Sequence, residues 1–363
     1  MPTGTTINSE EWDKLLHRRP LALDRERTKT SLSGKRILIT GAGGWIGSAL
    51  ACAIANFSPA HVVLLEASER SLYEIDNALQ QSPVEKTSIL GSVSDAMLLA
   101  EVFHRYQPQI VYHAAAFKHV PLMEQNPFAA VENNAIGTNL LVQAALHARA
   151  EQFILLSTDK AVDPVNIMGA SKRIAELVLL ARRTAATAMK ALRLGNVLGS
   201  EGSVVPLFRK QILAGGPVTV THPDARRFFL TTADAVTLLL EASSTETADC
   251  ILVPDLGEPV RMELLARHLI AEDAIPIVFT QLRPGDKLSE TLLSARESYV
   301  AQRDATSLRG VNSPALPLSV LDQALEQLQH ACKERSLQRL LQAVARAVPE
   351  YLPSALMQNG VSV

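Results

Sequence analysis

The sequence predicts an α/β fold in which a doubly wound parallel sheet is followed by a smaller C-terminal α/β lobe. Three observations support this prediction: apolar runs alternate with helix-patterned segments over the first 200 residues, a glycine-rich turn follows the first run, and the alternation breaks after about residue 200. Strands that alternate with helices are joined by right-handed crossovers, so they lie parallel and helices cover both faces of the sheet.

The strands are predicted where short apolar runs occur, at residues 36–40, 61–66, 87–90, 109–113, 152–157 and 190–194. We expect the intervening helices at 48–57, 69–80, 97–105, 127–149 and 169–189. In the second half we expect a turn and short strand at 214–224, helices at 233–243 and 260–271, a Pro/Gly turn at 283–285 and a helical stretch at 317–348. In that last stretch apolar residues recur at three-four spacing, and the helices can serve either to cap the core or to join subunits.

Composition excludes several classes of protein. Apolar residues make up 47% and charged residues 20% of the 363 residues, as in an ordinary globular protein, and a net charge of -2 gives no basic field for nucleic acid. The chain starts with a polar segment and has no apolar stretch near the ~20 residues that cross a bilayer, so we expect a soluble, cytoplasmic protein. Cys52, Cys250 and Cys332 are far apart, which favours buried, reduced thiols over a metal site.

A glycine-rich turn follows the first predicted strand. Gly41, Gly44 and Gly47 form the pattern G-x-x-G-x-x-G at the start of a helix, where backbone N–H groups can approach a pyrophosphate. Glu66 ends the second strand about 19 residues later, and a carboxylate there binds ribose hydroxyls and favours NAD over NADP. Arg70 lies close to Glu66 in the sequence, so NADP stays open as the alternative to NAD. The sequence offers no explanation for the bulky Trp45 in this turn.

The turn identifies the sheet as a Rossmann-type dinucleotide-binding domain. The chain then divides into an N-terminal extension (1–34), an NAD-binding Rossmann domain (35–200), a substrate lobe interleaved with it (201–310) and a C-terminal helical segment (311–363).

Five separated segments carry a resemblance to a known family. They are HAAAFKHVPLMEQNP (113–127), LLSTDKAVDPVNIMGASKR (155–173), RLGNVLGSEGSVVPLFRKQI (193–212), GGPVTVTHPDARRFF (215–229) and LRPGDKLSE (282–290). Together with the glycine turn they resemble the extended short-chain dehydrogenase/reductase superfamily. Within it they are similar to the polysaccharide-biosynthesis branch with its UDP-N-acetylglucosamine 4,6-dehydratases. LLHRRPLALD (15–24) resembles the segment before the catalytic domain of the large membrane-anchored members, and this chain is similar to that domain without their membrane helices.

The resemblance implies a 4,6-dehydratase with NAD as cofactor and a UDP-sugar as substrate. In such an enzyme the sugar C4 is oxidised, water leaves across C5–C6, and hydride returns to C6. By family analogy Thr158 binds the C4 oxygen, Asp159 is the acid at C6 and Lys160 is the base at C5. Because a lysine is a base only when neutral, we expect burial, Lys172 and the nicotinamide charge to lower the pKa of Lys160 against the opposing effect of Asp159.

Lys172 occupies the lysine position of the superfamily's Tyr-x-x-x-Lys pattern, in which the lysine contacts the nicotinamide ribose. The tyrosine position holds Met168, as in one branch of these dehydratases, and a thioether cannot accept the C4 hydroxyl proton. Our hypothesis is that Asp159, or a water that it holds, accepts this proton.

The resemblance assigns the remaining contacts by position. Asn134 corresponds to the helix asparagine that steadies the site, Lys118 faces cofactor or substrate, and Arg227 and Arg283 can clamp a diphosphate through forked hydrogen bonds. Asp286 stands where the family more often has Glu, and Ser92 where it often has an adenine-contacting Asp. The other cofactor positions are Trp45, Ile46, Ala114 and Ala115; the other substrate positions are Asn196, Gly202, Ser203, Val204, Thr219 and Thr221.

Two other functions remain open from the sequence. A UDP-sugar epimerase or a 5,6-dehydratase would use the same C4 oxidation, although an adjacent acid and base in Asp159 and Lys160 favour elimination. A non-catalytic NAD-binding protein would not require the full set of sugar-site motifs. Relatives in the superfamily often pair, so we expect a homo-oligomer.

Overall fold

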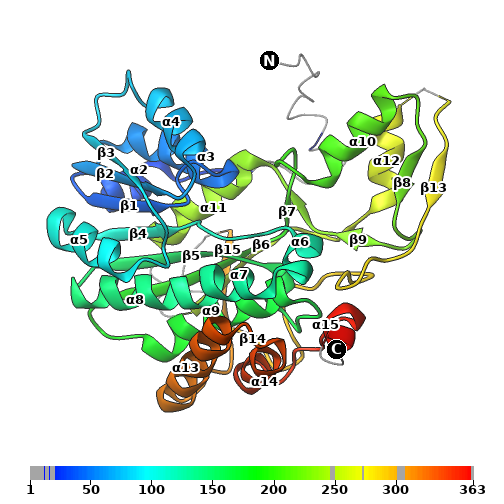
Figure 1. The fold of residues 1–363 in the computed structure, drawn as a ribbon. Coiled ribbons are helices and arrows are strands. Elements are labelled where there is room, and N and C mark those ends of the chain that lie inside the picture. Colours follow the sequence, from blue (N-terminus) through cyan, green and yellow to red (C-terminus); the bar gives the residue numbers. More distant parts are fainter. Residues whose placement is uncertain are drawn as a thin grey trace.

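The structure, a computed structural model, describes Trp12, Leu16 and residues 21–245, 250–271, 274–300 and 307–360. Within these residues the main feature is a nine-stranded sheet of order β14-β15-β11-β6-β5-β4-β1-β2-β3 (Figure 1). All neighbours from β3 to β11 pair in parallel, and β15 and β14 add antiparallel strands at the edge. The strands are β1 (Arg36–Thr40), β2 (His61–Glu66), β3 (Lys86–Leu90), β4 (Ile110–His113), β5 (Gln152–Thr158), β6 (Ala188–Leu194), β11 (Cys250–Pro254), β14 (Ser298–Tyr299) and β15 (Leu308–Asn312).

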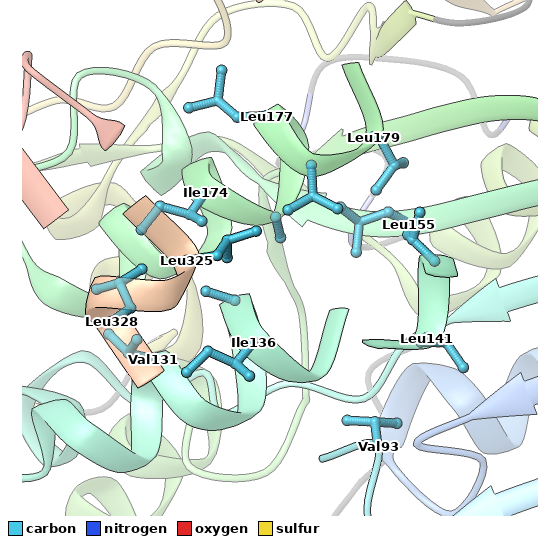
Figure 2. Close-up of a cluster of buried hydrophobic side chains, with 14 of the residues drawn as sticks. Val93, Val131, Ile136, Leu141, Leu155, Ile174, Leu177, Leu179, Leu325 and Leu328 are labelled. Atoms are coloured by element: carbon cyan, nitrogen blue, oxygen red, sulfur yellow. The ribbon is translucent and has the colours of Figure 1, made fainter. Parts of the chain in front are cut away.

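Helices cover both faces of this sheet. One face packs against α3 (Trp45–Ile54), α4 (Glu69–Ala78) and α11 (Thr232–Ser244). The other packs against α5 (Ala96–Tyr106), α7 (Pro127–Val131), α8 (Gly137–His147), α9 (Ile167–Arg182), α13 (Leu318–Glu334) and α14 (Leu337–Ala347). Figure 2 shows part of this second layer, where Leu155 of β5, Ile174 of α9 and Leu325 of α13 belong to one buried cluster.

Alternation along the strands produces the two layers. In β1, Ile37 and Ile39 belong to the core with α3 and α11, whereas Leu38 belongs to the core with α8 and α9. Side chains of a strand point alternately to the two faces, so a strand that is apolar throughout must be covered on both. This confirms the predicted Rossmann-type sheet.

A smaller lobe has its own core. It contains α10 (Val204–Leu213), α12 (Met262–Ile270), β8 (Val218–Val220), which pairs with β13 (Ile277–Phe279), and β9 (Arg226–Arg227), which pairs with β12 (Val260–Arg261). Two further short strands, β7 (Asn196–Val197) and β10 (Phe229–Leu230), pair with each other. Because β11 and β15 return to the main sheet, the chain passes from sheet to lobe and back.

The N-terminal segment contacts both cores. Trp12 and Leu16 are buried in the core of the smaller lobe, whereas Leu21 and Leu23 pack against the core of the main sheet. The helix α2 (Arg25–Leu32) follows and packs on α11. The described part of this extension therefore connects the lobe to the sheet.

The predicted strands agree with the structure to within two residues at each end, but three predicted helices differ. The expected helix 127–149 contains a π-helical turn at Glu132–Ile136, and the expected helix 169–189 ends at Arg182. The stretch 317–348 is two helices, because Arg335 adopts a left-handed conformation with φ 57° and the Ser336 hydroxyl caps the second one. Both helices are buried in the main core, so this stretch caps it. The short helices α6 (Val120–Gln125) and α15 (Ala355–Gly360) complete the set.

Two smaller sequence-based expectations concern membranes and cysteines. No helix among the described residues has both the length and the apolar character needed for a membrane crossing. Cys332 is buried and Cys52 is only half-buried, and both are free thiols, whereas the side chain of Cys250 lies outside the described part.

Candidate active site

The glycine turn between β1 and α3 brings backbone very close to backbone. Gly41 has φ 65°, and a Cβ on it would lie 2.6 Å from the backbone nitrogen of Ala115. A Cβ on Gly47 would lie 2.0 Å from the Gly41 carbonyl oxygen. Any side chain at these positions would force the turn open, so the glycines create a cradle at the start of α3. The backbone of Ala114 and Ala115, two of the predicted cofactor positions, lies against this turn.

Glu66 is held at the edge of this cradle. Its carboxylate accepts hydrogen bonds from the N–H groups of Gly43 and Ser68, both at 3.0 Å. Gly43 was not singled out from the sequence, although a Cβ there would lie 2.5 Å from the Ser71 backbone. Arg70 pairs with Glu74 at 2.9 Å, so its charge is partly compensated.

Trp45 gains a structural explanation. Its indole N–H donates to the Thr232 hydroxyl at 2.9 Å, and its ring lies 3.6 Å from where a Cβ on Gly199 would be. The residue therefore connects the glycine turn to α11 and to the segment after β7. Ile46 packs on the core beneath, and Ser92 accepts a bond from the Ser94 N–H at 3.1 Å.

Asn134 fixes the loop that follows β4. It is fully buried in the π-helical turn, accepts from the Phe117 N–H at 2.8 Å, and donates to the Phe117 carbonyl at 3.0 Å. Its amide also donates to the Ser171 hydroxyl of α9 at 3.1 Å. The neighbouring Lys118 is exposed at the surface of this loop.

A buried polar chain beneath this loop was missed by the sequence analysis. His113 contacts Thr40 at 2.7 Å and Thr138 at 2.8 Å through its two ring nitrogens. Thr138 donates to the Asn134 carbonyl, so its oxygen accepts from His113 Nε2–H and Thr40 donates to Nδ1. Burial, together with the charge of Lys172, lowers the pKa of His113 well below its ordinary value, so the ring is neutral.

The Thr-Asp-Lys trio forms a compact cluster at the carboxyl end of β5. Thr158 donates to Asp159 Oδ1 at 2.9 Å, and Lys160 Nζ donates to the same oxygen at 3.0 Å. Lys160 also donates to Asn196 Oδ1 at 2.9 Å, which brings one predicted substrate residue to the trio. Asp159 is fully buried, and its Oδ2 has no hydrogen-bond partner among the described residues.

The sequence analysis expected a lowered Lys160 pKa with the nicotinamide bound, whereas the ligand-free chain has the opposite shift. Burial lowers this pKa, but the negative charges of Asp159 and Glu290 and the hydrogen bond to Asp159 outweigh burial, so the pKa of Lys160 is raised. The Glu290 carboxylate lies 3.8 Å from Lys160 Nζ and was not identified from the sequence. In this structure Lys160 is therefore an ammonium ion.

Lys172 lies one turn after Met168 on α9. Both are only 3% exposed, and within the described part of the chain Lys172 Nζ has no hydrogen-bond partner. Burial lowers the pKa of Lys172 to about 8, although Glu176 opposes the shift. A buried ammonium without a partner is costly, so this position suits a ligand that supplies hydrogen-bond acceptors.

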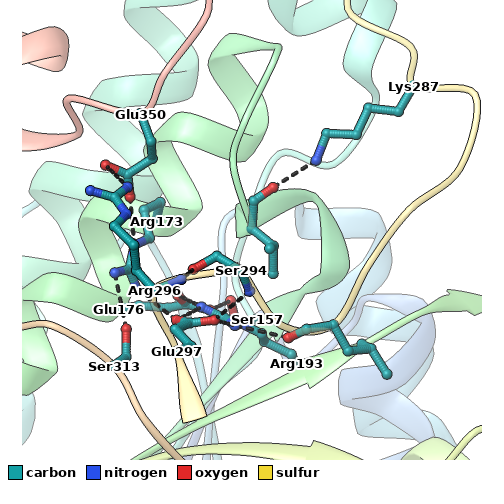
Figure 3. A network of polar contacts seen from close by, with 12 residues as sticks. Ser157, Arg173, Glu176, Arg193, Lys287, Ser294, Arg296, Glu297, Ser313 and Glu350 are labelled. Atoms are coloured by element: carbon teal, nitrogen blue, oxygen red, sulfur yellow. Dashed lines mark hydrogen bonds and ion pairs between the residues drawn. The ribbon is translucent and has the colours of Figure 1, made fainter.

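A buried network of ions supports α9 from below (Figure 3). Arg193 donates to both oxygens of Glu176, both oxygens of Glu297 and the Leu292 carbonyl, at 2.7–2.9 Å. A guanidinium has five N–H groups, and all five are used. The network therefore anchors the helix that carries Lys172 to the segment 292–297.

The predicted substrate residues of the lobe are dispersed. Gly202 contacts His119, since a Cβ there would lie 2.3 Å from that ring, and Ser203 with Val204 begins α10. Thr219 is engaged by Gln211, with contacts of 2.7 and 3.0 Å, while Thr221 lies just after β8.

The two predicted arginines do not converge on one point. Arg227 donates to the backbone carbonyls of Arg226, Lys287 and Leu288, which occupies much of its fork. Arg283 is exposed and pairs with Asp286 at 2.9 Å. The structure thus uses Arg227 to hold the loop that carries Arg283.

The residues around the glycine turn fit a dinucleotide. The cradle excludes side chains where a pyrophosphate would lie, and Glu66 presents a carboxylate at the end of β2. The unpartnered ammonium of Lys172 would gain acceptors from ribose hydroxyls.

Known proteins resemble this chain in sequence. Residues 37–310 match the family described as polysaccharide biosynthesis protein. The capsular polysaccharide biosynthesis protein CapD of Staphylococcus aureus is 43% identical over 306 residues, which are 82% of this chain and 51% of CapD. The UDP-glucose 4-epimerase of Rickettsia rickettsii is 32% identical over 276 residues, which are 72% of this chain and 79% of the epimerase. The chain therefore spans about half the length of CapD.

Solved structures show the same fold. The dTDP-glucose 4,6-dehydratase DesIV of Streptomyces venezuelae, crystallised as a double mutant with NAD and DAU bound, superposes with a TM-score of 0.64 at 21% identity. The match covers 83% of this chain and 98% of DesIV.

Proposed function

The chain belongs to the polysaccharide biosynthesis protein family, and from this premise we propose that it is an NAD-dependent UDP-N-acetylglucosamine 4,6-dehydratase. The observation that carries the proposal is the cluster at the end of β5. There Lys160 Nζ donates to Asp159 Oδ1, and the buried Asp159 Oδ2 has no hydrogen-bond partner among the described residues. An elimination needs both an acid and a base beside one sugar ring, and this cluster supplies both.

NAD is the proposed cofactor. When bound, it would take hydride from the sugar C4 and return it to C6. The glycine cradle, Glu66 and Lys172 would hold it, and the Glu66 carboxylate would repel the 2′-phosphate of NADP. Two crystal structures of DesIV have NAD bound, which supports the same choice here.

Asp159 can serve both proton transfers that involve oxygen. We infer that its free Oδ2 accepts the C4 hydroxyl proton, because Met168 cannot. The same proton then passes to the departing C6 hydroxyl, which leaves as water. Thr158 already bonds Asp159 Oδ1 and would orient the carboxylate beside the C4 oxygen.

Lys160 would remove the C5 proton and later deliver a proton to C5. It must first lose its resting proton, because its pKa is raised in the ligand-free chain, where burial is outweighed by Asp159 and Glu290. The protons balance: one moves from O4 to the leaving water through Asp159, and one moves from C5 to Lys160, whose amine protons exchange with solvent before one of them is delivered back to C5.

The experiment is to mix the purified protein with UDP-N-acetylglucosamine in deuterated water and record NMR spectra. We expect a 4-keto-6-deoxy product with deuterium at C5, and we expect Asp159→Asn to lose turnover while it still binds NAD. A product that keeps its C6 hydroxyl would indicate an epimerase, and a C5–C6 alkene would indicate a 5,6-dehydratase. Binding of NAD without any turnover would favour a non-catalytic protein.

A further inference from the structure

Glu290 is a buried carboxylate beside the trio to which the proposed reaction assigns no role. It ends the segment LRPGDKLSE and is 3% exposed. One of its oxygens lies 3.8 Å from Lys160 Nζ and the other lies 3.5 Å from Lys287 Nζ. A carboxylate buried to this degree is retained at a high cost in free energy unless cations compensate it.

The four charged groups form an alternating row: Asp159, Lys160, Glu290 and Lys287. Their side chains are 0%, 18%, 3% and 16% exposed, so water screens them weakly. Lys287 also donates to the Val162 carbonyl at 2.6 Å, a bond drawn in Figure 3. The row therefore connects the loop 281–290 to the residues directly after the trio.

Lys160 faces few other charged groups. Arg227 of β9 is the further charge that acts on it, and its positive charge opposes the effect of the carboxylates. Asn196 of β7 contributes a neutral oxygen at 2.9 Å. Among the described residues, two carboxylates thus lie beside the ammonium, and they are opposed by the Arg227 guanidinium and, on the far side of Glu290, by the Lys287 ammonium.

We propose that Glu290 is a positioning residue that holds the Lys160 ammonium between Asp159 and Asn196 and stabilises its charged form. The consequence for turnover rests on the proposed function, since Lys160 acts there as the C5 base. The stabilisation of the Lys160 ammonium by Glu290 concerns the ligand-free chain alone and does not depend on the proposed function. Glu290 lies on the loop 281–290, which also carries Arg283. The Glu290–Lys160 ion pair therefore links this loop to the proposed C5 base.

The first test needs no substrate. The pKa of Lys160 is measured from the pH dependence of its acetylation by isotopically labelled acetic anhydride, followed by mass spectrometry, with exposed Lys210 as the internal reference. Loss of a carboxylate within 4 Å of an ammonium shifts its pKa by about 1–3 units, so Glu290→Gln should lower the Lys160 value by at least about one unit. Glu258→Gln, at an exposed position, should leave it unchanged.

A second variant should shift the Lys160 pKa in the opposite direction. Lys287→Met removes a cation from the same row, so it should raise the Lys160 pKa, whereas general disturbance of the loop would move both variants in one direction. Equal Lys160 values in wild type and Glu290→Gln would overturn the proposal, as would a fall in both variants.

The second test uses turnover. If Lys160 is the C5 base, the acidic limb of the kcat–pH profile should move to lower pH in Glu290→Gln by the same amount as the acetylation value. An unmoved limb with a shifted acetylation value would overturn the catalytic part. A wild type that does not convert UDP-N-acetylglucosamine would refute the proposed function, and the acetylation result would still decide the role of Glu290.

Discussion

Replacing Lys172 by Met should make the ligand-free protein more stable. Burial, partly opposed by Glu176, lowers the pKa of Lys172 from 10.5 to about 8. At 1.36 kcal/mol for each pKa unit, the ammonium costs the folded state about 3 kcal/mol at neutral pH. Methionine has a similar shape and no charge, so Lys172→Met should raise the free energy of unfolding by about 1–3 kcal/mol.

The sign of the pH dependence follows from linkage. The unfolded chain binds the proton more tightly, so the penalty is fully present below pH 8 and disappears as pH rises from 8 towards 10.5. Urea unfolding of the wild type and Lys172→Met should therefore show that the gain in the free energy of unfolding at pH 9.5 is less than half the gain at pH 7. Lys29→Met, on the exposed side of α2, is the matched control. A less stable variant at pH 7, or a gain that does not depend on pH, would refute the reasoning.

Three further predictions follow from the packing. Gly47→Ala should abolish NAD binding in calorimetry, because its Cβ would lie 2.0 Å from the Gly41 carbonyl oxygen; unchanged affinity would contradict the cradle. Arg193→Met should destabilise the fold by about 3–5 kcal/mol in urea unfolding, because it leaves the two buried carboxylates of Glu176 and Glu297 with only Arg173 to pair with among the described residues, and a loss under 1 kcal/mol would count against the network. Trp12→Ala should lower the free energy of unfolding by about 3–5 kcal/mol by the same method, whereas Leu122→Ala, at an exposed position, should lower it little. Equal effects would show that Trp12 does not stabilise the smaller lobe.

The sheet could be predicted because its information is local. The inner residues of runs such as 36–40 and 61–66 (37–39 and 62–65) are continuously apolar, which favours a strand covered on both faces, and the glycine pattern marked the dinucleotide turn. Helix ends were less accurate, since the break at Arg335 depends on one left-handed residue and a serine cap in a sequence that otherwise continues its helical pattern.

The charge of Lys160 could not be predicted in the same way. Its sequence neighbour Asp159 was visible, but Glu290 lies 130 positions away and reaches the trio only because the loop 281–290 folds against β9. His113 was missed for a similar reason: its two partners, Thr40 and Thr138, come from a neighbouring strand and a helix. Such contacts depend on tertiary packing, which no spacing in the sequence encodes.

The complete use of the five N–H groups of Arg193 limits how this chain can evolve. Together with Arg173, which also pairs with both carboxylates, Arg193, Glu176 and Glu297 form a buried group of two cations and two anions. Any single replacement at Glu176, Arg193 or Glu297 therefore leaves that group with one unbalanced charge. Homologues that lack one of these three residues should therefore lack the others as well, so the three positions are expected to covary across lineages.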